Sequence, residues 1–203
     1  MKFKKEAYLM KLKMDMQNAY HKQLIKDKYT MIKATELALI ALIAKESLIM
    51  TYTPLLAKYM TKYEINTKYR KAAFIATILH ESGEFKYTRE IASGEAYEGR
   101  KDLGNIHKGD GKRFKGRGLI QLTGRTNYTM ASKFLGIDFV NHPEWMEEPI
   151  HATAVSAWWW KMNGLNSIAD TGNFKRITRA VNGGYNGMAD RLVYYNRALD
   201  ILS

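Results

Sequence analysis

Residues 72–83 of this chain read AAFIATILHESG. Residues 72–79 are apolar nearly all round, which predicts a helix buried on every side rather than one that lies on the surface. Asn66 and Thr67 supply capping groups at its start, and Gly83 can adopt the left-handed conformation that closes a helix. The acid Glu81 then lies at the end of a core helix, where a carboxylate is costly unless it has a partner or a task.

A second carboxylate, Glu90, follows nine positions later. If the helix continued, Glu90 would point to the opposite face and lie about 13.5 Å further along the axis. A break at Gly83 instead allows the chain to fold back, so that Glu90 faces Glu81. Two carboxylates at a controlled separation are what acid/base cleavage of a glycosidic bond requires.

The surroundings of the two acids suggest different roles. Burial at a helix end disfavours the charged form of Glu81, which suits a general acid. The polar setting of Glu90, beside Arg89, favours the charged form that activates a water. In the alternative interpretation Glu81 is a cap or an ion-pair partner, and Glu90 is an ordinary surface residue.

A second candidate group lies in residues 118–123, which we expect to be a short strand or extended segment. The two-residue period of a strand would place Gln121, Thr123 and Arg125 on one face. An amide, a hydroxyl and a guanidinium together suit a sugar or a catalytic water. A phosphate-binding loop is the rival interpretation, but the required Gly-Lys-Ser/Thr ending is missing.

A third candidate is the loop 182–187, which contains amides and an aromatic residue and precedes Arg191. The loop is suited to line a cleft, although a plain connection between two helices would have a similar composition. Trp158, Trp159 and Trp160 point three ways on a helix, and we favour core packing for them over a sugar platform. The histidines lack metal-ligand spacing and there is no cysteine, so no metal and no disulfide is predicted.

The remaining pattern is mostly helical. Seven of the residues 91–118 are glycine, which predicts an irregular surface segment whose backbone approaches another group closely. Gly and Pro signals delimit the expected helices, at about residues 34–50, 54–63, 127–135, 149–162, 174–181 and 189–202. Pro54 is expected in the first turn of its helix. The fold class is therefore mainly α with at most a small β element.

The length of 203 residues suits one folded domain. No secretory signal and no membrane span is expected, since the longest apolar run, residues 37–44, has eight residues. Residues 1–33 hold nine lysines against three acids, so we separate them as a basic extension from a catalytic domain over residues 34–203. Such charge fits an anionic membrane or wall polymer, or nucleic acid, while the simpler interpretation is a solvated extension.

Four blocks, residues 73–90, 97–105, 111–128 and 177–199, together resemble the family 19 glycoside hydrolases, specifically the chitinase-like endolysins of bacteriophages. The resemblance covers roughly residues 50–203 and implies a lysozyme-like, two-lobed helical fold with a long cleft and an inverting mechanism. Matched by position, Glu81 is the general acid, Glu90 the general base and Thr123 the hydroxyl that helps to hold the water. The implied residues that bind sugar or tune the carboxylates are Gln121, Asn127, Asn182 and Arg191.

Plant members of the family carry disulfides and a longer stretch between the two acids, so this chain resembles the phage branch more closely. The resemblance implies a monomer without a cofactor that cuts β-1,4 bonds in peptidoglycan glycan strands and lyses the host cell. It further implies synthesis in the host cytoplasm without a signal peptide and release through a membrane pore; no nucleic acid is expected as a partner. The alternatives are a lytic transglycosylase, a true chitinase and a non-catalytic module that binds the cell wall.

Overall fold

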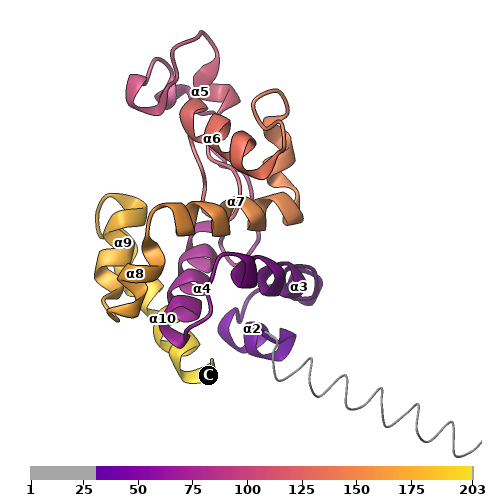
Figure 1. Ribbon diagram of the computed structural model, residues 1–203, viewed down its shortest axis with the longest axis vertical. Coiled ribbons are helices and arrows are strands. Elements are labelled where there is room, and N and C mark those ends of the chain that lie inside the picture. The colour runs from indigo at the N-terminus through magenta and orange to yellow at the C-terminus, as the bar shows by residue number, and fades with distance from the viewer. Residues whose placement is uncertain (1–30, 203) are drawn as a thin grey trace, which may run out of the picture.

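The computed structural model describes residues 31–202, and these residues form a helical molecule (Figure 1). The α-helices are α2 (Ala34–Ile40), α3 (Glu46–Lys62), α4 (Lys68–Ser82), α5 (Asp110–Arg113), α6 (Arg125–Leu135), α7 (Pro149–Met162), α8 (Leu165–Asp170), α9 (Phe174–Asn182) and α10 (Met188–Ile201). Short 3-10 helices are η1 (Glu95–Tyr97), η2 (Lys101–Leu103) and η3 (Pro143–Glu147). Two isolated bridges, Arg89–Arg117 and Arg117–Leu122, are the sole β pairing within residues 31–202. The prediction of a mainly α fold is confirmed.

Two hydrophobic cores divide these residues into two lobes. The larger core lies among α2, α3, α4 and α8–α10, and the smaller one lies under α6 and η3. Helix α7 serves both, because Trp160 packs in the larger core and Trp158 in the smaller one. Figure 1 shows α7 crossing the molecule between the two lobes. The two-lobed, lysozyme-like arrangement that the sequence predicts is therefore present.

Helix α4 is the centre of the larger lobe. Residues 71–79 are all buried, and α10 packs along the helix. The Thr67 hydroxyl accepts one of the free N–H groups of the first turn, that of Arg70, and Gly83 ends the helix in the left-handed conformation with φ 55° and ψ 54°. The predicted start and end of this helix are confirmed, since both are set by local chemistry.

The chain reverses in a turn directly after α4. Gly83, Glu84 and Phe85 all have positive φ (55°, 55° and 69°), which is unfavourable for the two non-glycine residues. Tertiary contacts hold them: Phe85 stacks on Tyr52 with ring centroids 4.5 Å apart. The buried Glu84 carboxylate accepts hydrogen bonds from the Ile43 N–H at 2.7 Å and the Tyr194 hydroxyl at 2.9 Å.

The prediction of one helix over residues 34–50 is wrong. Residues 41–45 separate α2 from α3, because two tertiary hydrogen bonds replace helical ones. Glu84 binds the Ile43 N–H, and Arg197 donates to the Ile40 carbonyl at 2.7 Å. Pro54 lies inside α3 rather than in its first turn. Because proline has no N–H, the Met50 carbonyl loses its helical hydrogen bond. Pro54 and Met50 are both exposed, so water can satisfy that carbonyl.

The extended segment predicted for residues 118–123 is a tight turn. Arg117 and Leu122 exchange two backbone hydrogen bonds (3.1 and 2.7 Å), and Gln121 has a φ of 57°. Arg125 begins α6 and does not share a face with Gln121 and Thr123. Helix α8 was not predicted, since six residues are too few to show a clear apolar period. The helix predicted for residues 54–63 begins eight residues earlier, at Glu46, while those predicted for residues 127–135, 149–162, 174–181 and 189–202 are confirmed to within about two residues.

The glycine-rich segment folds back on itself, as its composition predicts. A Cβ atom on Gly111 would lie 2.6 Å from the Glu98 nitrogen and 2.7 Å from the Gly94 oxygen. The Glu98 carboxylate accepts the N–H groups of Gly109 at 2.6 Å and Gly111 at 2.8 Å. Close approach of backbone to backbone therefore explains Gly94 and Gly111.

Asp110 anchors the smaller lobe and should make its stability depend on pH. The buried carboxylate accepts from the Arg125 guanidinium (2.8 and 2.5 Å) and from the His107 N–H, and these donors, Arg125 first, hold the pKa of Asp110 below its ordinary 3.8. A lowered folded-state pKa gives stability that is complete above 3.8 and is lost as the pH falls through the lowered pKa. We expect Asp110→Asn to lower the free energy of unfolding by about 2 kcal/mol at pH 7.

Urea denaturation at pH 7 and at about pH 3 measures this difference, which should shrink in acid because the wild type then loses the same interaction. The matched control is Asp102→Asn, an exposed acid paired with Arg100, which should leave the urea midpoint unchanged. An equal loss at both pH values would contradict the assignment.

Candidate active site

Glu81 and Glu90 line one cavity of about 310 Å³. Glu81 comes from the last turn of α4, and Glu90 from the chain that follows the turn at residues 83–85. The other lining residues are Tyr87, Arg89, Ile91, Ala92 and Gln121. The fold thus brings together the two carboxylates that a continuous helix would have kept apart, and it adds Gln121 from the second candidate group.

Glu81 is paired with a cation from the other end of the chain. Its carboxylate accepts a hydrogen bond from the Arg191 guanidinium of α10, and the side chains are 19% and 3% exposed. Arg191 also donates from Nε to the Asn186 carbonyl at 3.3 Å, while its buried Nη1 has no hydrogen-bond partner within residues 31–202. Arg191 therefore supplies a counter-charge to the largely buried Glu81 carboxylate, and the local sequence pattern did not predict this pair.

Helices α4 and α10 are joined by a second pair of side chains, one residue before Glu81 and one residue before Arg191. His80 Nδ1 lies 2.6 Å from the Asp190 carboxylate. Gly187, with φ 70°, lies so close to His80 that an added Cβ would collide with the imidazole ring. The loop before α10 is thus seated on the end of α4, which holds Arg191 against Glu81.

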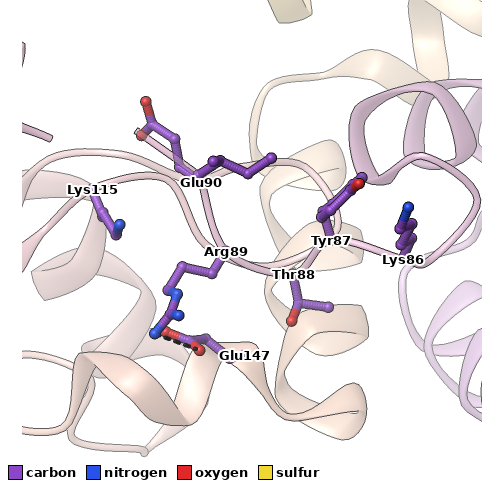
Figure 2. Close-up of a pocket in the computed structure, with 8 residues that line it drawn as sticks. Lys86, Tyr87, Thr88, Arg89, Glu90, Lys115 and Glu147 are labelled. Carbon is purple, nitrogen blue, oxygen red and sulfur yellow. Dashed lines mark ion pairs between the residues drawn. The ribbon is translucent and has the colours of Figure 1, made fainter. Parts of the chain in front are cut away.

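Glu90 is held by neutral donors. The Tyr97 hydroxyl donates to Oε1 at 2.9 Å, and the Gly116 N–H donates to Oε2 at 3.0 Å. Figure 2 shows the Glu90 carboxylate turned away from Arg89, whose side chain points to Glu147 with 3.7 Å between Nη1 and Oε2. The polar setting of Glu90 therefore comes from Tyr97 and Gly116, and these two donors orient its oxygens.

The backbone near Glu90 pairs with the segment that carries Gly116. The Glu90 N–H donates to the Gly116 carbonyl at 2.9 Å, and the Gly118 N–H donates to the Thr88 carbonyl at 2.9 Å. A Cβ on Gly116 would lie 3.0 Å from Gln121 Oε1 and 3.2 Å from Glu90 Oε2. Glycine at this position lets the Gln121 amide and the Glu90 carboxylate approach the same point.

A neighbouring cavity of about 230 Å³ contains three predicted site residues, Gln121, Thr123 and Asn127. Gln121 lines both cavities, so the two adjoin. The three side chains donate to backbone carbonyls of this segment: Gln121 to Gly118 at 3.0 Å, Thr123 to Gln121 at 2.9 Å and Asn127 to Thr123 at 2.7 Å. Arg125 is not in this group, because its guanidinium pairs with Asp110.

Asn182 lies at the end of α9, exposed and outside both cavities. Its Nδ2 donates to the Asn186 carbonyl at 3.4 Å, the same oxygen that Arg191 contacts. Its neighbour Val181 lines the 230 Å³ cavity. The structure thus places Asn182 in the loop that positions Arg191, while direct sugar binding by Asn182 stays a prediction.

Three residues of this site were not among the predicted site residues. Tyr97 and Gly116 hold Glu90, and Trp159 lines the 230 Å³ cavity. Tyr97 lies within residues 97–105, one of the blocks that resemble the family 19 glycoside hydrolases, and this resemblance was the signal that could have marked it as a site residue. Core packing is confirmed for Trp158 and Trp160, and Trp159, which is partly exposed, packs against both cores as well as lining the cavity.

No group of three or more metal-ligating acids or histidines occurs in residues 31–202. Within the same residues, no helix has the length and hydropathy that a membrane crossing would need.

Tyr97→Phe tests the role of the hydroxyl on Glu90. Burial, and next the bond to Glu90, raise the pKa of Tyr97, so it remains a donor at neutral pH. Losing a hydrogen bond to a charged group should reduce kcat about 10-fold without unfolding the domain. Initial rates and circular dichroism measure this; Tyr69→Phe, an exposed tyrosine of α4, is the control. An unchanged kcat would show that Gly116 alone orients Glu90.

This combination of a two-lobed helical fold and two carboxylates on one cavity defines a class, the helical glycoside hydrolases. Residues 56–168 match the model of the class I chitinase family, glycoside hydrolase family 19. The chain belongs to glycoside hydrolase family 19.

Relatives in sequence agree with this assignment. A family 19 domain-containing protein of Haemophilus influenzae is 32% identical over 164 residues, covering 65% of this chain and 79% of the relative. An endochitinase of Arabidopsis thaliana is 37% identical over 114 residues, covering 56% of this chain and 38% of the relative. The match thus spans most of the bacterial relative but less than half of the plant one.

Solved structures agree in fold. Chitinase C from Streptomyces griseus superposes with a TM-score of 0.67 at 20% identity, over 85% of this chain and 92% of that chain. A class IV chitinase from Zea mays gives a TM-score of 0.67 at 23% identity, over 84% and 92% of the two chains. The lysozyme-like helical fold is shared with these enzymes.

Proposed function

We propose that this glycoside hydrolase cleaves β-1,4 bonds between amino sugars by an inverting mechanism. The observation that carries the proposal is the shared cavity of Glu81 and Glu90. Glu81 protonates the leaving oxygen as the bond between C1 and that oxygen breaks. A water adds to C1 from the opposite face and gives its proton to Glu90.

The contacts of Glu90 support its role as the base, and the contact of Glu81 fixes the position of the acid. Glu90 accepts only neutral donors among its hydrogen-bond partners in residues 31–202, Tyr97 and Gly116, which aim its oxygens without neutralising them. Gln121 lies beside Glu90 on the same cavity and is suited to contact the water or the sugar. Arg191 holds the Glu81 carboxylate in place at the end of α4.

We further propose peptidoglycan glycan strands as the substrate, with an endolysin role in which the enzyme reaches the wall through a membrane pore. The net charge of +12 favours an anionic polymer over a neutral one. Chitin is the second candidate, because several relatives of this chain are named endochitinases.

Mass analysis of fragments released from purified peptidoglycan tests the proposal. Hydrolysis should yield saccharides with ordinary reducing ends, and inversion of a β bond should yield the α anomer first, visible by NMR. Anhydro-sugar products with full activity in Glu90→Gln would instead establish a lytic transglycosylase, which needs one glutamate and no water. Release from soluble chitin oligomers alone would establish a chitinase, and binding without any cleavage a wall-binding module.

A further inference from the structure

A larger cavity, of about 380 Å³, adjoins the catalytic one and is unused by the mechanism above (Figure 2). Four residues, Tyr87, Arg89, Glu90 and Ile91, line both cavities. A glycan bound over Glu81 and Glu90 would therefore have its substituents within reach of this second cavity. Three cationic side chains, from Lys86, Arg89 and Lys115, line this cavity together with the acids Glu90 and Glu147.

The two lysines have neutral partners. Lys115 Nζ donates to the Ala92 carbonyl at 2.8 Å, and Lys86 Nζ lies 5.0 Å from the centroid of the Tyr87 ring. A carbonyl and an aromatic ring position an ammonium group but leave its charge uncompensated. Figure 2 shows Lys115 pointing into the space between Glu90 and Arg89.

The third cation, Arg89, shares its acidic partner Glu147 with a second arginine, Arg117. The Arg89 side chain is 60% exposed, and its Nη1 lies 3.7 Å from Glu147 Oε2, beyond hydrogen-bond distance. Glu147 Oε1 already accepts from the buried Arg117 at 2.8 Å. One carboxylate thus faces two guanidinium groups, and the cavity keeps an excess of positive charge beside the catalytic cavity.

We propose that Lys86, Arg89 and Lys115 form a subsite for a carboxylate carried by the muramyl sugar, on its lactyl group or its stem peptide. Arg89 supplies a guanidinium whose fork matches a carboxylate, and the lysines supply point charges. Ile91, which is exposed and lines both cavities, gives the sugar an apolar contact between them. Chitin carries no carboxylate, so the subsite selects peptidoglycan; this inference rests on the proposed function.

The test uses the full chain and one glycan in two charge states. Native peptidoglycan is compared with the same material after carbodiimide coupling to ammonia, which converts its carboxylates to amides. We expect the wild type to prefer the native material about 10-fold in kcat/KM, mainly through KM, and to lose this preference with added salt. In the double variant Arg89→Gln/Lys115→Gln the preference should fall to about 2-fold or less.

The ratio of the two substrates removes any general effect of the variant on Glu90 or on folding, because both rates would then fall together. The matched control is Lys133→Gln/Arg176→Gln, which removes one lysine and one arginine from the exposed faces of α6 and α9 and should keep the 10-fold preference. The lactyl carboxyl is amide-linked to the stem peptide in intact strands, so an amidase removes the peptide carboxylates and frees the lactyl one; comparing strands before and after this treatment identifies which carboxylate is bound.

Two results would overturn the subsite: a wild type that cuts both materials equally, or a double variant that keeps the preference. Either leaves the proposed function intact, since peptidoglycan is still cleaved. A wild type that releases nothing from either material removes the proposed function and the subsite with it. The two failures are therefore distinguishable in one set of assays.

Discussion

Glu81→Gln is expected to lower turnover about 1,000-fold, because general acid catalysis contributes roughly 10²–10⁴-fold and an amide has no acidic proton to give. The fold should survive. Glutamine has the same shape, and its side-chain oxygen can still accept the hydrogen bond from Arg191. Release of reducing ends from glycan strands measures the loss, and circular dichroism and thermal unfolding check the fold.

Glu144→Gln is the matched control, since Glu144 is a surface acid outside both catalytic-site cavities and should leave turnover unchanged. Near-normal activity in Glu81→Gln would remove Glu81 from the acid role, whatever the state of the fold. A comparable loss in the Glu144 control would show that the assay reports something other than the reaction at this site.

Arg191→Met should have the largest effect on stability. It leaves the Glu81 carboxylate, 19% exposed, without a counter-charge and also removes the contact to the Asn186 carbonyl. Removing one partner of a largely buried ion pair costs about 3 kcal/mol. For a domain of this size that corresponds to a fall in Tm of about 6–12 °C. Turnover should fall as well, because Arg191 positions Glu81.

A double-mutant cycle that combines Arg191→Met with Glu81→Gln measures how much the ion pair itself contributes to stability. In Glu81→Gln/Arg191→Met no charge is left unpaired, so part of the lost stability should return, with a coupling of about 1–3 kcal/mol. Arg176→Met, on the exposed face of α9, is the control for loss of a guanidinium. Additive effects of the two substitutions would mean that the pair contributes nothing to stability.

The elements that the sequence predicts well are those set by neighbouring residues. Helix α4 follows from its apolar run, and its ends follow from the Thr67 cap and the Gly83 conformation. The close approach of backbone near Gly111 follows from glycine density. These signals are local, because capping, helical period and left-handed φ act within a few residues.

The features that the sequence did not predict depend on distant partners. The break between α2 and α3 exists because Glu84, 41 residues away, takes the Ile43 N–H. The turn at Gln121 replaces the expected strand because Arg117 and Leu122 pair with each other and Arg117 pairs with Arg89. Backbone groups satisfied by tertiary contacts leave no periodic trace in the sequence.

The sequence by itself determined the candidate acids and the break between them: a carboxylate at the end of a core helix, a glycine break, and a second carboxylate nine positions on. Only the tertiary structure decided how each acid is held. Arg191, 110 residues from Glu81, comes into contact because α10 packs on α4. Gly116 reaches Glu90 because residues 88–90 pair with residues 116–118, and the Tyr97 hydroxyl reaches it from η1. A carboxylate's chemistry belongs to its side chain, but its charge state and direction belong to its neighbours in space.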